Sequence, residues 1–363
     1  MRIALACPYS WDAPGGVQVH VRQLGRHLLE RGHEVLVLAP GRSRDPEWWV
    51  RIVGRPVPVP YNGSVAPICP SPGSARLVRW SLEEFRPDVV HVHEPFAPST
   101  GMFAALRSPA PVAATFHAYA ERSALRAAAS PLLRLVWRKL DARIAVSRAA
   151  ASFASRRFGD GFRVVPNGAD VDLFMSATAP DRRPGRTMLF VNRLDRRKGF
   201  PVAVRAFAIL ARRLPDLRFT VVGDGRERGA VSRLDPEARA RLEMLGTLRH
   251  EEVARCHAMA DVFVAPSAGR ESFGIVLVEA MAAGLPVVAS AIPGYDEVVR
   301  DGVDGLLVPP SDPRALAEAV ERVLTDQGLA RGLAESGRER SKRYAWDRVT
   351  ADLEPIYEEL ASG

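Results

Sequence analysis

Two carboxylates in one apolar stretch are the first residues whose types and spacing suggest chemistry. Residues 269–290 read GRESFGIVLVEAMAAGLPVVAS, with Glu271 just before the apolar run and Glu279 within it. Carboxylates are seldom buried without a partner. We expect Ser272 to cap a helix that begins near Phe273, whose free amides would bind an anion or a hydroxyl. Glu279, two turns along, can accept two hydrogen bonds from neighbouring hydroxyls, as on a ribose; the alternative is a solvent-facing position on the helix.

A basic loop offers complementary chemistry. Residues 192–199 read NRLDRRKG, in which Arg193 ends a predicted strand and Lys198 lies five residues on, before a helix. A guanidinium fork and a flexible ammonium suit a diphosphate leaving group. Their charge would offset the negative charge that builds on the diphosphate as its bond to a sugar breaks. The alternative interpretation is a solvated basic loop.

Glycines near the N-terminus and one histidine complete the candidates for ligand contact. The PGG stretch, which contains Gly15 and Gly16, follows a predicted strand and opens a helix. Glycines let the backbone approach a ligand closely, and a helix N-terminus favours an anion; the alternative is an ordinary tight turn. His117 ends a strand in TFHAY. It is a catalytic candidate, although a lone histidine is more often structural.

The sequence does not predict a metal site. His91 and His93, in HVHE, share one face of a strand, but no third ligand is evident elsewhere. The Asp-Val-Asp sequence of residues 170–172 resembles a divalent-cation motif of nucleotide-sugar enzymes, but it lies in a linker rather than after an early strand. The segment VGDGRERG, residues 222–229, misses the dinucleotide-binding fingerprint by one residue.

The elements that must position these residues form two consecutive α/β units. Residues 2–6 and 34–40 are predicted strands, with a helix between them whose apolar stripe recurs at helical spacing. A second strand–loop–helix series starts after residue 186, and a Pro-Asn-Gly turn within residues 164–174 is the predicted hinge. The last segment is predicted to be a helix interrupted or bent near Pro355. In doubly wound sheets ligands bind beyond the carboxyl ends of strands, where all of these candidates lie.

Composition excludes several classes of protein. The 363 residues are 47% hydrophobic and 25% charged, as in a soluble globular protein of two domains. Three scattered cysteines argue against a disulfide framework and for a reducing compartment. We identify neither a signal peptide nor a membrane span. The net charge of +8 indicates either a compositional bias toward Arg or an anionic partner. A nucleic-acid binder would need clustered aromatic or groove-reading elements, which the sequence lacks.

Four stretches together resemble a known family. They are PGGVQVHV, VPNGADVDLF, NRLDRRKG and ESFGIVLVEAMAAGLPVVAS, and they extend from residue 14 to residue 290. The chain resembles the retaining glycosyltransferases of family four, which have the GT-B fold. CPYSWDAPGGVQVHV and VPVPYNGSVAP are most similar to the actinobacterial phosphatidylinositol mannosyltransferases. The resemblance implies two Rossmann-like doubly wound parallel-sheet domains facing across a cleft.

The resemblance also implies a domain organisation. Residues 1–168 would form the acceptor-binding domain and residues 169–344 the nucleotide-sugar donor domain. The C-terminal helix, residues 345–363, would pack back on the N-terminal domain.

Roles for individual residues follow from the resemblance alone. Gly15 and Gly16 would approach the donor, Arg193 and Lys198 would bind its diphosphate, and Glu279 its ribose. The remaining implied contacts are to the transferred sugar (His117, Glu271, Phe273 and Gly274) and to the acceptor (Tyr9, Asn62 and Arg122). We expect no side-chain nucleophile, no tightly bound cofactor and no protein site for a divalent cation.

The sequence departs from the family in two places. Asn192 stands where the family has glycine before the arginine. The stretch 71–86, a strongly basic membrane-facing helix in the mannosyltransferases, here has its Arg residues offset by Glu83 and Glu84. A basic face beside Trp137 is expected to compensate; it comprises Arg126, Arg134, Arg138 and Lys139. The alternative is a helix packed by Leu132, Val136 and Leu140 with a solvated Arg side.

We therefore expect a cytoplasmic enzyme that is peripheral on the inner face of the membrane. It would move mannose from GDP-mannose to an acceptor hydroxyl, with the inositol of phosphatidylinositol as the expected acceptor. The alternatives are a UDP-sugar-dependent hexosyl- or N-acetylhexosaminyltransferase with another lipid or small-molecule acceptor and, more remotely, a nucleotide-sugar epimerase. The residues do not identify the nucleotide base, the hexose, the linkage or the oligomeric state.

Overall fold

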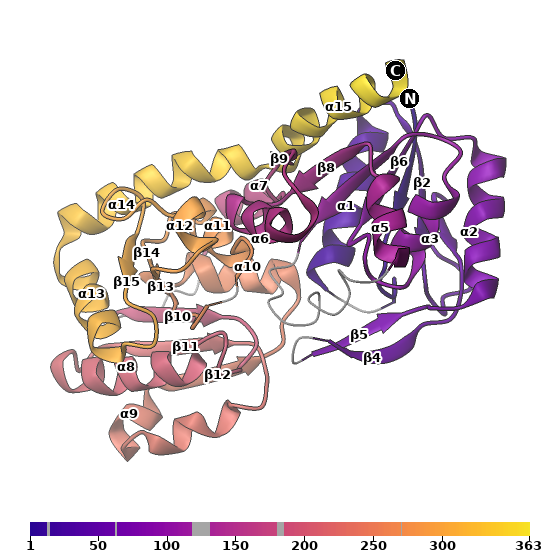
Figure 1. The fold of residues 1–363 in the computed structure, drawn as a ribbon. Helices are drawn as coiled ribbons and strands as arrows, with labels where there is room; N and C mark the ends of the chain where they lie inside the picture. Colours follow the sequence, from indigo (N-terminus) through magenta and orange to yellow (C-terminus); the bar gives the residue numbers. More distant parts are fainter. Residues whose placement is uncertain (13–14, 62–63, 118–130, 180–184, 270) are drawn as a thin grey trace. The chain divides into compact units, whose positions relative to one another are not determined.

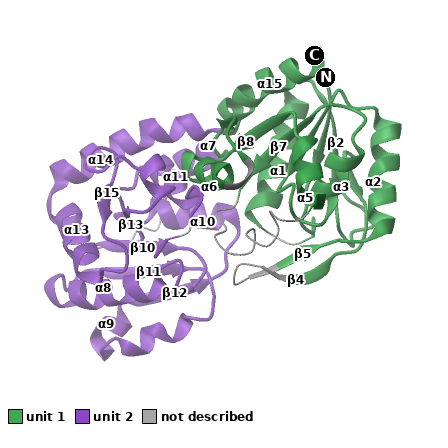
Figure 2. Cartoon of the chain, viewed as in Figure 1, with its two compact units in different colours: residues 1–168, 346–363 green, residues 169–345 purple. Residues whose placement is uncertain are grey.

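The structure of the chain is a computed structural model. It describes residues 1–12, 15–61, 64–117, 131–179, 185–269 and 271–363, so Asn62 and Arg122 lie outside the described residues. The chain divides into two compact units. Unit 1 comprises residues 1–168 and 346–363, and unit 2 comprises residues 169–345 (Figure 2).

Unit 1 is built on a seven-stranded parallel sheet with the order β3-β2-β1-β6-β7-β8-β9. Since the order reverses between β1 and β6, the ligand-binding switch point of this sheet lies beyond the ends of these two strands. The strands are β1 (Arg2–Ala6), β2 (Glu34–Ala39), β3 (Val50–Ile52), β6 (Val89–His93), β7 (Val112–Phe116), β8 (Ala142–Ala145) and β9 (Phe162–Val164).

Helices cover both faces of this sheet. Alternate residues of β1 explain the two layers, because Ile3 and Leu5 enter one apolar core and Ala4 and Ala6 the other. The first core is shared with α1 and α15, and the second with α2, α3 and α5. The helices of unit 1 are α1 (Gly16–Glu30), α2 (Pro72–Phe85), α3 (Thr100–Arg107), α5 (Pro131–Arg138), α6 (Arg148–Phe158) and α15 (Trp346–Ser362).

Helix α15 belongs to unit 1 although it follows unit 2 in the sequence. It packs against α1, and Arg31 and His33 bind Glu354 at 2.6 and 2.9 Å (Figure 1). The predicted interruption is wrong, since the helix runs through Pro355 as one element. Its Tyr357 and Trp346 are buried in the core beside β6 and α1.

Unit 2 is built on a six-stranded parallel sheet with the order β12-β11-β10-β13-β14-β15. Here the order reverses between β10 and β13, so the loops after these two strands meet at the switch point. The strands are β10 (Thr187–Val191), β11 (Arg218–Val222), β12 (Leu242–Gly246), β13 (Val262–Ala265), β14 (Val287–Ser290) and β15 (Leu306–Val308).

The helices of unit 2 also form two layers. α8 and α13 share one core on one face, whereas α11 packs against α7 and α14. The helices are α7 (Val171–Ser176), α8 (Phe200–Arg213), η1 (Arg228–Arg233), α9 (Pro236–Ala240), α10 (His250–Ala258), α11 (Ile275–Ala282), α12 (Tyr295–Val298), α13 (Pro313–Thr325), α14 (Gln327–Ser341) and η2 (Lys342–Tyr344).

The expectation of two doubly wound parallel sheets is confirmed. A small antiparallel hairpin, β4 (Val57–Tyr61) with β5 (Ser64–Ile68), is added to unit 1. Tyr9 forms an antiparallel bridge with Ile68 of this hairpin. Within the described ranges, every helix is too short or too polar to cross a membrane.

Candidate functional site

A cluster of four histidines lies at the carboxyl ends of strands β6 and β7 in unit 1; it comprises His20, His91, His93 and His117. His93 ends β6 and His117 directly follows β7, and because these parallel strands are neighbours their side chains meet. Nδ1 of His93 and Nε2 of His117 lie 2.9 Å apart. His20, on the first turns of α1, contacts the rings of His93 and His117 with centroid distances of 5.3 and 4.7 Å.

Neighbouring polar side chains hold the histidine cluster in place. The two ring nitrogens of His91 lie 2.7 Å from the Tyr357 hydroxyl and 2.7 Å from the Thr115 hydroxyl. Trp346 packs its ring against His20, with a centroid distance of 5.1 Å. The backbone N–H of His117 donates to the Glu94 carboxylate at 2.7 Å. Both ends of α15 therefore help to shape a cluster whose histidines come from the first 117 residues.

Burial keeps these histidines neutral. Desolvation lowers the pKa of His117 to about 4 and that of His91 to about 3, and it holds the pKa values of His20 and His93 well below the ordinary range. The neighbouring histidines lower these pKa values further, except that of His117. His117 is half-buried, so it can present a neutral imidazole to a ligand. Such a group orients by hydrogen bonding but is not a proton donor of ordinary strength near neutral pH.

Three further residues of the predicted site belong to unit 1, namely Gly15, Gly16 and Tyr9. Gly16 is the first residue of α1 and Gly15 is its N-cap. Tyr9 lies three residues beyond the end of β1, and it is half-buried.

In unit 2 the basic loop, residues 192–199, follows β10, and Glu271 lies in the loop after β13. The Lys198 ammonium lies 2.9 Å and the Arg197 guanidinium 3.2 Å from the Glu271 carboxylate. The Glu271 side chain is 8% exposed, so this is a largely buried ion pair with two cations. Burial lowers the pKa of Lys198, and Glu271 opposes that effect.

Arg193 is placed differently from Lys198. Its side chain is half-exposed and lies 3.3 Å from Asp195, while Asp195 also accepts a hydrogen bond from the Lys198 backbone N–H at 2.7 Å. Asp195 thus fixes the loop and also pairs with the Arg193 guanidinium. The structure brings Lys198 and Glu271 together.

The predicted cap of the following helix is wrong. α11 begins at Ile275, and its N-cap is Gly274 rather than Ser272. Gly274 has a φ of 103°, and a Cβ there would lie 2.7 Å from the Tyr295 ring, so only glycine fits. Phe273 does not begin the helix; its side chain is buried against Tyr344 at a centroid distance of 5.4 Å. Phe273 and Gly274 can therefore offer backbone groups to a ligand rather than side chains.

Glu279 lies on α11 and is buried, which excludes the solvent-facing alternative. Burial raises the pKa of its carboxyl group to about 7, and nearby His250 partly opposes this. Among the residues that the structure describes, none donates a hydrogen bond to the Glu279 carboxylate. A buried carboxylate without a donor is costly, and it can accept hydrogen bonds from hydroxyl groups.

Asp170, from the Asp-Val-Asp sequence, has a local structural role. Its carboxylate lies 3.2 Å from Nε2 of His250, and it raises the pKa of that histidine. The ring of His250 also packs on Phe174 of α7. The first Asp of that sequence therefore helps to join α7 to α10.

Sequence reasoning missed His20 and Arg197. His20 lies four residues after Gly16, so helical spacing places both on one side of α1, a signal that was available. Arg197 was seen only as part of a basic loop. Its pairing with Glu271 depends on the adjacency of β10 and β13, which the order of strands along the chain does not show.

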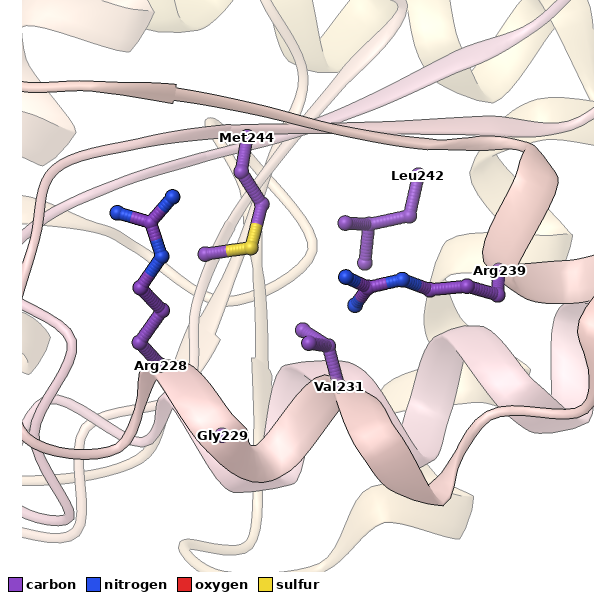
Figure 3. A pocket seen from close by; sticks show the side chains of 6 residues that line it. All are labelled: Arg228, Gly229, Val231, Arg239, Leu242 and Met244. Atoms are coloured by element: carbon purple, nitrogen blue, oxygen red, sulfur yellow. The ribbon is translucent and has the colours of Figure 1, made fainter.

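A separate hollow of about 460 Å³ lies beside edge strand β12 in unit 2. Leu242 and Met244 project from β12 toward Val231 of η1, and Arg228 and Arg239 flank them (Figure 3). None of the predicted site residues lines it.

Comparisons with known proteins cover nearly the whole chain. The family described as "Glycosyltransferase Family 4" matches residues 14–173, and that described as "Glycosyl transferases group 1" matches residues 179–340. The phosphatidyl-myo-inositol mannosyltransferase of Mycolicibacterium smegmatis is 41% identical over 366 residues, covering 99% of this chain and 94% of its own. The D-inositol 3-phosphate glycosyltransferase of Xylanimonas cellulosilytica is 30% identical over 393 residues, with coverages of 96% and 93%.

A solved structure agrees in fold. Sucrose-phosphate synthase from Thermosynechococcus elongatus superposes with a TM-score of 0.73 at 25% identity, covering 99% of each chain.

Proposed function

The chain belongs to the GT-B glycosyltransferases of family four, and we propose that it transfers mannose from GDP-mannose to the inositol ring of phosphatidylinositol. The observation that carries this proposal is the 41% identity, over 99% of the chain, to a phosphatidyl-myo-inositol mannosyltransferase. At that identity and coverage the two proteins share their fold throughout.

The donor nucleotide is assigned to unit 2. Arg193 is half-exposed and close to the end of β10, as a group that binds a diphosphate must be. Lys198 is paired with Glu271, so a diphosphate that reaches its ammonium would compete with that carboxylate. Glu279 would accept hydrogen bonds from two ribose hydroxyls, which supply the donors that the described residues do not.

The transferred sugar is assigned to His117, Glu271 and the backbone near Phe273 and Gly274. His117 is neutral and half-buried, so it can hydrogen-bond a sugar hydroxyl without adding charge beside a developing oxocarbenium ion. Glu271 is stabilised by two cations, which weakens it as a nucleophile, so its proposed role is to hold sugar hydroxyls.

Retention of configuration follows from attack on the face that the diphosphate leaves. The acceptor oxygen forms the new bond to the anomeric carbon as the bond to the phosphate oxygen breaks, and the leaving phosphate takes the hydroxyl proton. Arg193 and Lys198 would stabilise the charge on that phosphate. Gly15 and Gly16 would lie against the donor, and Tyr9, Asn62 and Arg122 against the acceptor.

We also propose that the enzyme works in the cytoplasm, peripherally on an anionic membrane through α5. The half-buried ring of Trp137, the expected aromatic anchor, packs on Phe162 with a centroid distance of 6.0 Å and carries Arg143 over its face at 4.0 Å. Instead Leu132 and Leu135 are 47% and 49% exposed. The alternative packing is confirmed for Val136 and Leu140, which are buried, and is wrong only for Leu132, because Leu133 takes its place in the core.

The surroundings of these leucines favour a lipid surface. Arg134, Arg138 and Lys139 lie exposed beside them on and just after α5. Two apolar side chains among three cations are suited to anionic lipid. On α2, by contrast, Arg79 is paired with Glu83 at 2.7 Å, so its charge is offset.

The function is tested by supplying the purified chain with labelled GDP-mannose, UDP-glucose or UDP-N-acetylglucosamine. Each donor is combined with phosphatidylinositol vesicles, with phosphatidylcholine vesicles, or with inositol 3-phosphate in solution. Label in a lipid product only with GDP-mannose and phosphatidylinositol supports the proposal. Transfer only from a UDP-sugar, or only to the soluble inositol phosphate, overturns the donor or the acceptor, respectively.

Vesicle flotation tests the membrane face. Leu132→Ser with Leu135→Ser should abolish co-flotation with vesicles that contain an anionic lipid. The matched control is Leu77→Ser, an equally exposed leucine on α2. Equal loss in both variants, or none in the first, removes α5 as the membrane-binding helix.

A further inference from the structure

We propose that His20, His93 and His117 form a binding site for a divalent transition-metal ion such as Zn²⁺. One ligand nitrogen from each of the three residues lies within 4.8 Å of the other two. From the sequence, His91 and His93 were possible metal ligands, but no third ligand was evident. The fold supplies the missing ligands from the first turns of α1 and from the end of β7.

The rings already have the spacing of a metal site. Three imidazoles around one tetrahedral Zn²⁺, with Zn–N bonds of about 2.0–2.1 Å, place their ring centroids about 5 Å apart. The observed centroid distances are 4.7 Å for His20–His117, 5.3 Å for His20–His93 and 5.2 Å for His93–His117. The centroid spacing of the three rings therefore matches that of a tetrahedral site.

Two nitrogens of the trio have no hydrogen-bond partner within the part of the chain that the structure describes. They are Nδ1 of His20 and Nε2 of His93, and both side chains are more than nine-tenths buried. Buried nitrogens without a partner are uncommon and call for an explanation. A metal ion bound by these histidines would supply that explanation, because each unsatisfied nitrogen would then form a bond to the metal.

The donor set indicates the class of ion. Three imidazoles and no carboxylate suit Zn²⁺, Cu²⁺, Ni²⁺ or Co²⁺ rather than Mg²⁺ or Ca²⁺, which prefer oxygen. His91 supports the trio from the next position on the same face of β6, with its ring 4.4 Å from that of His93, and it is itself held by Tyr357 and Thr115. A fourth position would be filled by water, reached past the half-buried His117.

Metal binding replaces a hydrogen bond with metal–nitrogen bonds, and the three histidines keep the same number of protons. The hydrogen bond between Nδ1 of His93 and Nε2 of His117 breaks, and each neutral imidazole keeps its one proton on the ring nitrogen that does not bind the ion. Three metal–nitrogen bonds form. An ion seated there would occupy His117, so it would inhibit sugar transfer; this consequence alone rests on the proposed function.

Cobalt binding by the purified full-length chain, stripped of metal with a chelator, tests the site without any substrate. Co²⁺ titration should give one equivalent with intense visible absorption typical of four-coordination, and Zn²⁺ should displace it. The variants His20→Phe, His93→Gln and His117→Asn should each weaken binding at least about tenfold. His250→Gln, in unit 2, is the matched control and should bind as the wild type does. Near-ultraviolet circular dichroism checks that each variant is folded.

The outcomes separate this site from the enzyme's function. Absence of stoichiometric Co²⁺ or Zn²⁺ binding by the wild type, or equal binding by the folded His20→Phe, His93→Gln and His117→Asn variants, overturns the site. Zn²⁺ binding that leaves sugar transfer unaffected would keep the metal site and remove His117 from the reaction. Failure of sugar transfer with every donor would leave the Co²⁺ result standing.

Discussion

The histidine cluster of unit 1 and the basic loop of unit 2 lie at the switch points of two similar sheets, but they bury polar groups in opposite ways. In unit 1 desolvation leaves the imidazoles neutral, with a His93–His117 contact of 2.9 Å. In unit 2 Lys198 and Arg197 share the Glu271 carboxylate. The first arrangement offers neutral hydrogen-bonding groups, whereas the second supplies fixed charge. A reaction that separates charge between a sugar and a diphosphate needs both.

The largest effect should come from removing charge that faces the diphosphate. Arg193→Ala should lower turnover about 100- to 1000-fold, because a preorganised donor to the leaving group is lost. Steady-state rates with saturating acceptor measure this. The matched control is Arg196→Ala in the same loop, whose side chain is 86% exposed and pairs with Glu227; it should stay within about twofold. Equal rates for both variants would show that the loop acts through its net charge.

The second effect concerns stability rather than rate. Glu271→Gln leaves Lys198 and Arg197 without their shared carboxylate, and this should cost about 2 kcal/mol of unfolding free energy; Arg197 remains about one-third exposed, which limits the cost. Urea unfolding of the full-length chain measures this loss of unfolding free energy. Glu227→Gln, which removes the partner of an exposed arginine, should cost less than about 1 kcal/mol. If Glu271→Gln lowers the unfolding free energy as little as Glu227→Gln does, the stability of unit 2 does not depend on its buried charges.

A third, smaller effect is pH-dependent. Burial raises the pKa of Glu279 to about 7, so its carboxylate form grows as pH rises through that value. GDP affinity should therefore rise between pH 6 and pH 8 in the wild type, and Glu279→Gln should weaken binding about tenfold at pH 8 and flatten the profile. Calorimetric titration at both pH values measures it. The same raised pKa means that Glu279 opposes folding as pH rises, so Glu279→Gln should be the more stable protein at pH 8.

The last prediction is that protonation of His117 has no effect on turnover. Desolvation lowers the pKa of His117 to about 4, so its protonation should not alter turnover between pH 5.5 and pH 8. Rates of the Glu279→Gln variant across that range isolate the histidine. An inflection near pH 6.5, abolished by His117→Gln, would show that His117 titrates as an ordinary histidine, and the contrast between the two units would then weaken.

Much of the fold and part of the candidate site could be predicted from the sequence. Apolar runs followed by polar loops identify parallel strands, and chemistry-bearing residues that end such runs must meet at one edge of the sheet. This reasoning placed Lys198 and Glu271 at the same edge, where they contact each other. It also placed His117 at the end of β7.

The rest depends on contacts that a linear pattern does not contain. The pairing of Arg197 with Glu271 and the meeting of His20 with His93 require knowledge of which strands and helices are neighbours. The cap at Ser272 failed because a glycine with positive φ, Gly274, delays the start of α11 by two residues. The basic neighbours of Trp137 in sequence suggested a surface anchor, but its half-buried ring also packs on Phe162, which no linear pattern shows.

The position of helix α15 in the sequence also has a consequence for the folding of unit 1 during synthesis. Trp346 packs on His20, and the Tyr357 hydroxyl lies 2.7 Å from His91, although about 330 and 266 residues separate these pairs in the chain. A chain translated only as far as unit 2 has all four histidines but lacks Trp346 and Tyr357, which contact His20 and His91. Unit 2 is continuous in sequence, whereas unit 1 also needs residues 346–363. A chain that stops before α15 should therefore hold its histidine cluster less firmly.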